Sequence, residues 1–313
     1  MDLSIVIISW NVADLLAKCL TSIESQGTSL RYEVIVIDSD SRDHSVAMVR
    51  EQFPWVKLTA CDENIGFVRG NNLGASQATG RLLMLLNPDT ELLPGALERM
   101  VEVMESDATI GALGPHTLNS DGTHQPSRHR FPTVWTGVFE STWLEAYAPK
   151  QMMSQFRVTD LPNEGTYPVG WVRGSCLLTY RALWDELGGF DERYIMYSEE
   201  LDYCKRVHNA GWKIYYVGDA RIIHHSGQST AQVKTRSHVH FQHSKLRYFR
   251  KFHGLGAALF LWTVIVLNYM WQLTLEGAKW LLGNKRPMRR ERVRTYWVVL
   301  RSLLGAGEQV AMR

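Results

Sequence analysis

The sequence predicts an α/β protein with a mostly parallel mixed sheet flanked by helices, followed by a helical tail. Short β-branched and apolar runs alternate with segments of helical period through about the first 115 residues. The run Leu82–Leu86 is uninterrupted, which is typical of a parallel strand buried on both faces. The residues from Lys234 onward combine a long uncharged stretch with many basic residues, which indicates a separate tail.

The first half of the chain is expected to alternate strand and helix, which requires parallel pairing through right-handed crossovers. Leu15, Leu16, Cys19, Leu20 and Ile23 give the first helix one apolar face. In order, the expected elements are a strand at 3–9, a helix at 12–26, a strand at 33–38, a helix at 43–53, a short strand at 56–60, a helix ending near 79 and a strand at 82–86.

The second half is expected to be less regular. A polar segment contains His116, His124, Arg128, His129 and Arg130, and its histidines match no standard zinc spacing, so we expect an exposed loop. Residues 133–168 have no clear period and predict a variable insertion or loop. The remaining expected elements are strands at 111–115, 171–180, 212–217 and 221–224 and a helix at 199–209.

Composition places the chain among globular proteins of one or two domains. Of its 313 residues 45% are hydrophobic, which argues against extensive disorder. The four cysteines, Cys19, Cys61, Cys176 and Cys204, have no paired spacing, so we expect reduced thiols and a cytosolic environment. The N-terminus lacks the basic region of a signal peptide, and we expect a first strand there instead.

The net charge of +2 conceals two regions of opposite sign. From Lys234 to the end there are 15 Lys or Arg residues against 3 Glu and no Asp, a net charge of +12. The first 233 residues contain 19 basic and 29 acidic residues, a net charge of −10. We therefore expect an acidic body at 1–233 and a basic tail at 234–313 whose partner is polyanionic.

Acidic residues follow two of the predicted strands. Asp38 ends the second strand, and Asp89 follows Leu82–Leu86 after Asn87 and Pro88, which stop the ladder. In an open α/β sheet, residues at these positions face the region beyond the carboxyl ends of the strands, where ligands bind. Asp38 alone is more typical of a turn or helix cap, because capping side chains surround it.

Three further segments contain candidate functional residues. The loop at 63–72 combines glycines, amides and one Arg, which could meet phosphates, although plain turns often have this composition. Glu199, Glu200 and Asp202 begin a helix, where the dipole favours acids and where a carboxylate can also act as a general base. His224 and His225 close a strand; such a pair is usually solvated, but given Asp89 one of them could bind metal.

Two classes of nucleotide-binding protein are disfavoured by the sequence. The turn Ser9-Trp10-Asn11 after the first strand has no glycine, which excludes the dinucleotide-binding fingerprint of dehydrogenases. The N-terminal Gly-rich loop with a Lys or Arg that would hold a triphosphate in a nucleotidyltransferase is also missing.

An ordered series of motifs is more specific than any of its members. It consists of Ser9-Trp10-Asn11, Asp38, Asn64-Ile65-Gly66-Phe67, Gly70-Asn71-Asn72, Asn87-Pro88-Asp89-Thr90, Asn119-Ser120-Asp121-Gly122, Gln125-Pro126-Ser127, Arg130-Phe131-Pro132, Trp171-Val172-Arg173-Gly174-Ser175-Cys176, Gly188-Gly189-Phe190-Asp191-Glu192, Ser198-Glu199-Glu200-Leu201-Asp202, Ala210-Gly211-Trp212 and His224-His225-Ser226-Gly227-Gln228-Ser229. The series covers roughly residues 3–253 and resembles glycosyltransferase family 2, most closely its rhamnosyltransferase-like branch. The resemblance implies a GT-A fold, with a nucleotide-sugar half at about 1–115 and an acceptor half at about 116–233.

The resemblance also implies a donor site for a nucleotide-diphospho-sugar. Asp38 would hold the base or ribose, and Asp89 a divalent ion, Mg²⁺ or Mn²⁺, on the diphosphate. Asn87 stands where many members have an acidic residue, so metal binding would depend on Asp89 with His224 or His225. The residues assigned to nucleotide-sugar binding are Ser9, Asn11, Asp38, Asn64, Gly66, Arg69, Asn72, Asn87 and Asp89.

In this family the second residue of a Glu-Asp pair accepts the proton from the acceptor hydroxyl. Glu200 occupies that position with one extra methylene, which changes its reach by about 1.5 Å. We predict Glu200 as the base, with Glu199 as the alternative. The residues assigned to the acceptor side are Trp171, Gly174 and Asp202.

The tail predicts membrane association. Leu255–Leu275 contains no charged residue and is about as long as the roughly 20 residues that span a bilayer. Basic residues flank it on both sides, whereas a single crossing leaves the positive flank on one side. We therefore expect in-plane or re-entrant docking on an anionic cytoplasmic surface of the inner or plasma membrane, with a second interfacial helix at 296–304. The alternatives are a span and a helical pair that packs on the body or forms a homo-oligomer; nucleic acid is a weaker match.

The sequence thus predicts an inverting, metal-dependent glycosyltransferase that moves a sugar, with rhamnose as a candidate, to a hydroxyl acceptor. The tail favours a polyprenyl-diphosphate-linked saccharide as acceptor, as in the assembly of cell-surface polysaccharide. Two alternatives stay open: a nucleotidyltransferase on a related fold, and a catalytically inactive membrane-bound scaffold, since Glu200 replaces the usual Asp.

Overall fold

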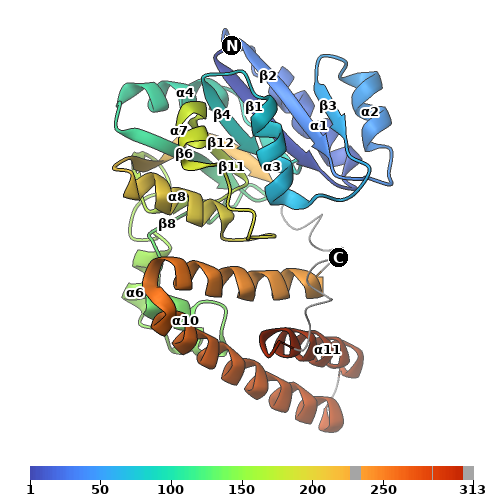
Figure 1. Ribbon diagram of the computed structural model, residues 1–313, viewed down its shortest axis with the longest axis vertical. Helices are drawn as coiled ribbons and strands as arrows, with labels where there is room; N and C mark the ends of the chain where they lie inside the picture. The colour runs from blue at the N-terminus through green and yellow to red at the C-terminus, as the bar shows by residue number, and fades with distance from the viewer. Residues whose placement is uncertain (226–233, 284, 306–313) are drawn as a thin grey trace. The chain divides into compact units, whose positions relative to one another are not determined.

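The computed structural model describes residues 1–225, 234–283 and 285–305, so residues 226–229 of the last motif lie outside the described residues. The described chain divides into two compact units, coloured along the chain in Figure 1. The first comprises Met1–Phe131, Ser154–Ile195 and the residues from Glu199 to His225. The second comprises Pro132–Met153, Met196–Ser198 and the described residues from Lys234 onward.

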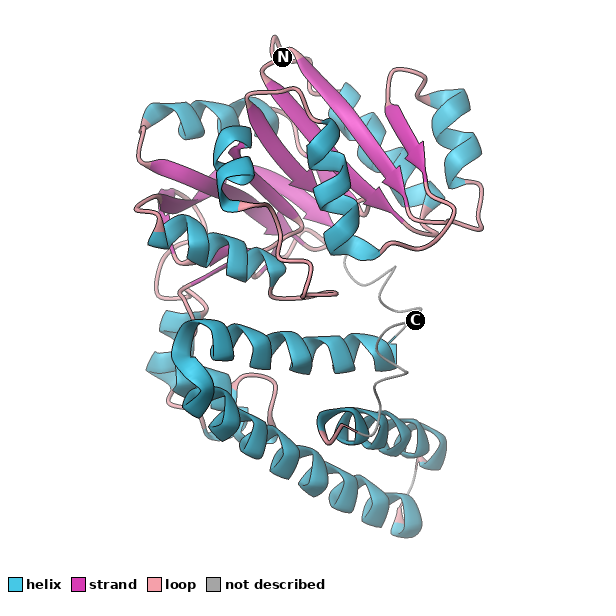
Figure 2. Cartoon of the chain, in the orientation of Figure 1, coloured by secondary structure: helices cyan, strands magenta, loops and turns pink. Residues whose placement is uncertain are grey.

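The first unit is built around a mixed, mostly parallel sheet of order β3-β2-β1-β4-β11-β6-β12-β5 (Figure 2). β1 pairs in parallel with both β2 and β4, so the direction of winding changes at β1. The carboxyl ends of these three strands meet at one edge, the position at which open α/β sheets bind ligands. The strands are β1 (Leu3–Ser9), β2 (Tyr32–Asp38), β3 (Lys57–Ala60), β4 (Leu82–Leu86), β5 (Thr90–Leu92), β6 (Ile110–Leu118), β11 (Cys176–Tyr180) and β12 (Lys213–His224).

Helices cover both faces of this sheet, because successive strand side chains point to opposite faces and nearly all are apolar. Ile5 and Ile7 of β1 face one core, and Val6 and Ile8 face the other. The helices on the first face are α1 (Ala13–Glu24), α2 (Ser45–Gln52) and α4 (Ala96–Ser106), and those on the second are α3 (Gly66–Gln77), α7 (Arg181–Leu187) and α8 (Glu199–Asn209). The predicted fold class is confirmed.

Two predictions for the strands were wrong in detail. The single strand expected at 171–180 is divided into β10 (Trp171–Val172) and β11, because residues 173–175 leave the ladder to form a loop. The two strands expected at 212–217 and 221–224 are one strand, β12. It continues to pair with β6 across an irregularity between Val217 and Arg221.

The polar segment at 116–130 is not the exposed loop that we expected. It contains β7 (His124–Gln125), which pairs with β6, and β8 (Arg128–His129), which pairs with β10. The guanidinium of Arg128 is buried 4.1 Å from the centre of the Tyr216 ring and donates to backbone carbonyls of the segment before β9 (Thr166–Val169). Carbonyl oxygens accept from Nη2 and the Tyr216 ring faces the charge, whereas Nε and Nη1 have no hydrogen-bond partner among the described residues. The sequence shows that this segment is polar but not that it is buried.

The second unit is helical. It contains α5 (Val134–Phe139) and a 3₁₀ helix (Trp143–Tyr147) from the insertion, and α10 (Lys234–Leu282) and α11 (Arg286–Leu303) from the tail. Another helix of the insertion, α6, spans Lys150–Phe156. α10 bends at Gly254, whose φ of 87° and ψ of 171° lie in a region essentially restricted to glycine.

The core of the second unit is formed by residues of both tail helices, α10 and α11. These buried residues are Val239, Ile265, Val266, Tyr269, Val299, Leu300 and Leu303.

Among the described residues, one helix, at Thr235–Leu282, is long and apolar enough to cross a membrane by length and composition. The helix expected at 296–304 is the last part of α11, which begins earlier, at Arg286.

Candidate active site

Ser9 and Asp38 lie side by side at the carboxyl ends of β1 and β2, where they are register partners. Both side chains are buried. One oxygen of Asp38 accepts from the backbone N–H of Ser41 at 2.9 Å, whereas Oδ2 and the Ser9 hydroxyl have no hydrogen-bond partner among the described residues. Because buried polar atoms are nearly always paired, these two atoms are available to a ligand.

Amide side chains form hydrogen bonds that stabilise the loops around Ser9 and Asp38. Asn11, in the left-handed region with φ of 53°, accepts from the backbone N–H of Arg42 at 2.7 Å. Asn64 Oδ1 accepts from the N–H of Gly66 at 3.0 Å and from the Ser39 hydroxyl at 3.1 Å. These predicted donor-site residues therefore shape the loops at the ends of β1 and β2.

Arg69 and Asn72, from α3, reach the turn after α7. Asn72 bonds both the N–H and the C=O of Phe190, each at 2.9 Å. Arg69 lies 4.0 Å from Glu192 at the surface. Both side chains thus have protein partners, and their assignment to nucleotide-sugar binding stays a prediction.

Asp89 forms a corner with a residue from the other end of the chain. β4 ends at Leu86, and Asp89, three residues later, is buried with 6% of its surface exposed. The antiparallel pairing of β5 with β12 brings His224 opposite Thr90. His224 Nε2 is 3.2 Å from Asp89 Oδ1 and 3.4 Å from the amide nitrogen of Asn87. The structure therefore brings together three residues that the sequence assigned to one site.

His224 is oriented by a residue that sequence reasoning missed. Its Nδ1 lies 2.7 Å from Oε1 of Gln125, a buried side chain that also donates to Asn119 at 2.8 Å. Because an amide oxygen can only accept, Nδ1 donates this hydrogen bond, and Nε2 is the ring nitrogen that faces Asp89 and Asn87. The signal was present in the motif Gln125-Pro126-Ser127, to which we had assigned no role.

His225 points away from this corner. Its Nε2 lies 2.6 Å from Glu91 Oε1 and its Nδ1 lies 2.7 Å from the Ser120 hydroxyl. Both ring nitrogens are thus engaged, so His224 is the better candidate for a metal ligand.

The corner fits a divalent ion that takes most of its ligands from substrate. Within the described residues no group of three or more His, Cys, Asp and Glu side chains could hold a metal ion. The available atoms are the Asp89 carboxylate, Nε2 of His224 and Oδ1 of Asn87, a buried oxygen without a hydrogen-bond partner in the described chain. Mg²⁺ and Mn²⁺ are commonly held by one or two such groups together with phosphates.

The acid pair begins α8. Glu199 is buried and Glu200 is half-buried, with N–H groups of Gly174 and Leu201 donating to its carboxylate. Burial raises the pKa of both carboxyls, and the neighbouring charge of Glu200 raises the pKa of Glu199 further. The less enclosed Glu200 is therefore the better candidate for the base, and its role stays a prediction.

The loop at 173–175 connects the acid pair with the Asp89 corner. The Ser175 carbonyl accepts from the N–H of Asn87 at 3.0 Å, and Gly174 lies beside the Glu200 side chain. The charge of Arg173, which sequence reasoning did not single out, partly offsets the effect of burial by lowering the pKa of Glu200. The two groups of candidate residues therefore lie at the same edge of the sheet.

The other two acceptor-side residues are engaged within the protein. Asp202 is fully buried and accepts from Arg206 at 2.7 Å and from the Tyr194 hydroxyl at 3.2 Å. Trp171 stacks on His129 with ring centroids 4.4 Å apart. Their roles toward an acceptor stay predictions.

The histidines of the segment 116–130 form no metal centre. His116 Nε2 and His124 Nδ1 are 3.0 Å apart, and burial lowers the pKa of His124 to about 4. Burial also lowers the pKa of His129 to about 3. The rings of His124 and His129 are therefore neutral at neutral pH.

Solved structures with the same architecture are GT-A glycosyltransferases. A Pyrobaculum calidifontis mannosyltransferase in complex with GDP-Man and Mn²⁺ has a TM-score of 0.53 at 17% identity, over 99% of this chain and 86% of that one. TarS residues 1–349 from S. aureus, in complex with UDP-GlcNAc, has a TM-score of 0.53 at 14% identity, over 100% and 76%. At these identities the likeness shows the fold.

The chain belongs to glycosyltransferase family 2, whose profile (Glycosyl transferase family 2) matches residues 4–163, just over half of the chain. It is 28% identical over 277 residues to an N-acetylglucosaminyl-diphospho-decaprenol L-rhamnosyltransferase of Mycobacterium tuberculosis, 84% of this chain and 89% of that protein. It is 24% identical over 236 residues to the rhamnosyltransferase WbbL of Escherichia coli K12, over 71% and 83%. The resemblance inferred from the motifs is confirmed, and the protein is a glycosyltransferase.

Proposed function

We propose that the protein is an inverting L-rhamnosyltransferase that acts on a polyprenyl-diphosphate-linked saccharide in the assembly of cell-surface polysaccharide. The observation that carries the proposal is the convergence of Asp89, His224 and the acid pair at one sheet edge. The sugar is supported by the names of two relatives, and the lipid-linked acceptor by the name of the mycobacterial one. Residues 1–233 would form the catalytic domain and residues 234–313 a tail that docks on the cytoplasmic face of the membrane.

The donor would lie across the carboxyl ends of β1, β2 and β4. Asp38 Oδ2 and the Ser9 hydroxyl are the unpaired atoms that would hold the nucleoside. Asp89 and His224 would hold Mg²⁺ or Mn²⁺, which when bound neutralises charge on the departing nucleoside diphosphate. Gln125 would orient the ring by its hydrogen bond to Nδ1, so that Nε2 is the nitrogen that meets the metal.

Glu200 would accept the proton of the acceptor hydroxyl as its oxygen bonds to the anomeric carbon and the bond to the diphosphate breaks. One in-line displacement inverts that carbon. The N–H groups of Gly174 and Leu201 hold the carboxylate in place. Burial and the charge of Glu200 raise the pKa of Glu199, which disfavours a second negative charge beside the base.

The test is transfer of rhamnose from nucleotide-activated L-rhamnose to N-acetylglucosaminyl-diphospho-polyprenol by the full chain in the presence of Mn²⁺. We expect product of inverted configuration. Glu200→Gln should lower kcat by about 10²–10⁴-fold while Mn²⁺-dependent thermal stabilisation by the donor is retained. Asp89→Ala should abolish that stabilisation. The matched control is Glu186→Gln, an exposed residue of the neighbouring helix α7.

Other outcomes would contradict specific parts of the proposal. Release of pyrophosphate from a nucleoside triphosphate and a sugar phosphate would identify a nucleotidyltransferase. Donor binding without transfer to any lipid-linked acceptor would favour an inactive scaffold. If donor stabilisation by Mn²⁺ survives Asp89→Ala, the metal role of Asp89 is wrong.

A further inference from the structure

The outward face of α10 beyond Gly254 is apolar. Leu259, Phe260, Leu267, Met270 and Trp271 recur at helical spacing, and each is between 45% and 58% exposed. The opposite side of the helix packs against α11 in the core of the unit. A surface helix of a water-soluble domain has polar side chains on its outer face, so this reversed pattern indicates an apolar environment.

Four polar residues of this stretch point inward or are satisfied within the helix. Asn268 is buried and accepts from a backbone N–H of the 3₁₀ helix at 3.1 Å. Glu276 is 4% exposed and accepts from Arg289 at 2.8 Å. The hydroxyls of Thr263 and Thr274 each donate to the carbonyl one turn earlier at 3.0 Å. The outer face therefore presents no unsatisfied polar side chain from these positions to hydrocarbon.

Exposed aromatic rings of the insertion extend this face. Trp135 lies edge-on to Phe260 with ring centroids 6.3 Å apart, and Trp143 lies 6.2 Å from Trp271. Trp135 is 62% exposed and Tyr147 is 74% exposed. Trp and Tyr concentrate at membrane–water interfaces, because their rings are apolar and their N–H and O–H groups are polar.

The partner helix argues against a crossing. α11 lies along α10: Trp262 Nε1 donates to the carbonyl of Leu303 at 2.9 Å, and Arg289 pairs with Glu276. Arginine side chains are costly inside hydrocarbon, so α10 cannot cross while α11 remains packed against it. The arginines on α11 are Arg286, Arg289, Arg290, Arg292, Arg294 and Arg301.

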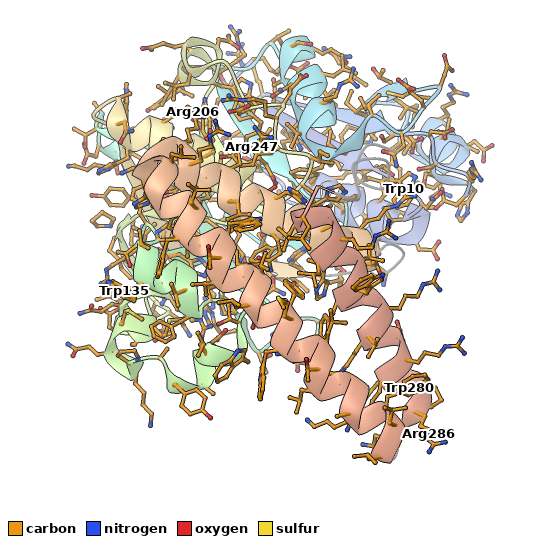
Figure 3. All side chains as sticks on the ribbon, turned by 60° about the horizontal axis from the view of Figure 1, so that its bottom comes forward. Trp10, Trp135, Arg206, Arg247, Trp280 and Arg286 are labelled. Carbon is orange, nitrogen blue, oxygen red and sulfur yellow. The ribbon has the colours of Figure 1, made fainter. Side chains whose placement is uncertain are left out.

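The end of the α10–α11 hairpin carries exposed cations beside the apolar face. Figure 3 labels Trp280 and Arg286 at this end. Lys279, Lys285 and Arg290 are also exposed there. Basic residues next to an interfacial helix are attracted to anionic lipid headgroups.

We propose that the second half of α10, with Trp135, Trp143 and Tyr147, lies in the plane of an anionic bilayer surface and does not span it. The proposal deepens the proposed function, on which it rests for the lipid-linked acceptor. Its occupant is one lipid leaflet, because apolar side chains, interfacial aromatics and cations coincide on the same unit.

The test measures how deeply successive residues of α10 lie in the bilayer when the full chain is bound to vesicles. Single substitutions Leu259→Cys, Thr263→Cys, Leu267→Cys, Met270→Cys and Thr274→Cys are labelled with an environment-sensitive fluorophore. The background is Cys61→Ser, because the other three cysteines are buried. These sites cover about 22 Å of helix axis. With vesicles that contain anionic lipid and depth-graded quenchers, we expect one shallow depth for all five labels. A depth that changes continuously from residue 259 to residue 274 would overturn the in-plane proposal.

A second measurement separates lipid from a second copy of the chain. The pair Phe260→Ser and Leu267→Ser should weaken binding to anionic vesicles by about tenfold or more, whereas Trp55→Ser, an exposed residue of the first unit, should not. If the parent fails to bind vesicles and instead forms a dimer that the same pair dissociates, the face is a protein interface. Because neither measurement uses donor or acceptor, docking without rhamnosyl transfer would contradict only the proposed function.

Discussion

At the scale of single residues, the acid pair shows how burial can divide roles between two identical side chains. Glu199 and Glu200 are neighbours in sequence, but one is enclosed in the protein and the other is half-buried and bound by backbone N–H groups. The sequence alone left the choice of base open. The difference in surroundings favours Glu200 as the predicted base, because burial and the neighbouring charge both raise the pKa of Glu199, whereas Arg173 and backbone N–H groups oppose the rise at Glu200.

Glu199→Gln tests this division through stability. The pKa of Glu199 in the folded protein lies well above its ordinary value of 4.5, so the unfolded chain releases this proton at lower pH than the folded one. Its contribution to stability is therefore fully present below pH 4.5 and declines as pH rises. We expect the melting temperature of Glu199→Gln relative to the parent to increase as pH rises above 4.5. A difference independent of pH, like that of the control Glu186→Gln, would show that the pKa of Glu199 is not raised in the folded protein.

Gln125 is a positioning residue whose role can be measured. Gln125→Leu removes the acceptor that keeps the proton on Nδ1 of His224. We expect affinity for Mn²⁺ in the presence of nucleoside diphosphate to fall by about 10–100-fold, as for other groups that orient metal ligands. Unchanged affinity would remove His224 from the metal site. Gln151→Leu in α6 is the matched control.

The positions of candidate residues were predicted correctly where a strand end fixes them, while their roles stay predictions. Asp38 and Asp89 follow strands, and parallel pairing brings their positions to one edge. Gln125 and Arg173 were not assigned roles, because they act through short strands and a loop whose partners are distant in sequence. The spacing of apolar residues along the chain does not predict contacts between segments that are distant in sequence.

At the scale of elements, a buried carboxylate links several elements at the edge of the sheet opposite the candidate site. Glu33 of β2 accepts from the Ser4 hydroxyl at 2.6 Å, from Lys57 at 2.5 Å and from both the N–H and hydroxyl of Thr79 at 2.7 Å. Burial opposes its charge, but these hydrogen bonds outweigh burial and lower the pKa of Glu33 to about 2. Strands β1, β2 and β3 and the end of α3 thus share one acceptor.

Glu33→Gln should therefore destabilise the protein by about 1–3 kcal/mol at neutral pH. Because the pKa of Glu33 is lower in the folded chain than its ordinary 4.5, its contribution is present above pH 4.5 and is lost as pH falls toward 2. The difference in free energy of unfolding, measured by denaturant titration, should shrink over that range. Glu24→Gln, at an exposed position of α1, should show neither effect.

The ends of elements were predicted well where an apolar run stops at residues that cannot continue a strand. They were predicted poorly where the pairing of strands distant in sequence decides them. The run Leu82–Leu86 is β4, as expected, because Asn87 and Pro88 end it. The strand expected at 171–180 is broken although its residues favour extended structure. Only the pairing of β10 with β8 and of β11 with β4 separates the two pieces, and that pairing is not local.

At the scale of the whole molecule, charge and hydropathy predicted the tail but not its partner segment. The insertion at 132–153 belongs to the same compact unit as α10 and α11. Its sequence has no period, and its aromatic residues contact positions more than a hundred residues away, such as Phe260 and Trp271. Such long-range contacts could not be read from either segment separately.

Docking of the whole chain on anionic vesicles should depend partly on salt. Since the Debye length is about 10 Å at 0.1 M, raising ionic strength screens the tail cations while the apolar face still binds. We expect the apparent affinity to fall to a lower plateau and not to zero. Lys285→Gln with Arg286→Gln should reduce the salt dependence, and Lys18→Gln, exposed on α1, should not. Complete loss of binding at high salt would leave no role for the apolar face.

The bend at Gly254 has a consequence for sequence variation. The residue is exposed, and a methyl group added to it would meet no atom within 4 Å, so a count of neighbours predicts that any amino acid is tolerated. Its positive φ predicts the reverse, since other residues would have to abandon that backbone conformation. In a saturation mutagenesis scan, Gly254 should therefore accept as few other amino acids as a buried core position. Solvent exposure does not predict which positions of the tail tolerate substitution.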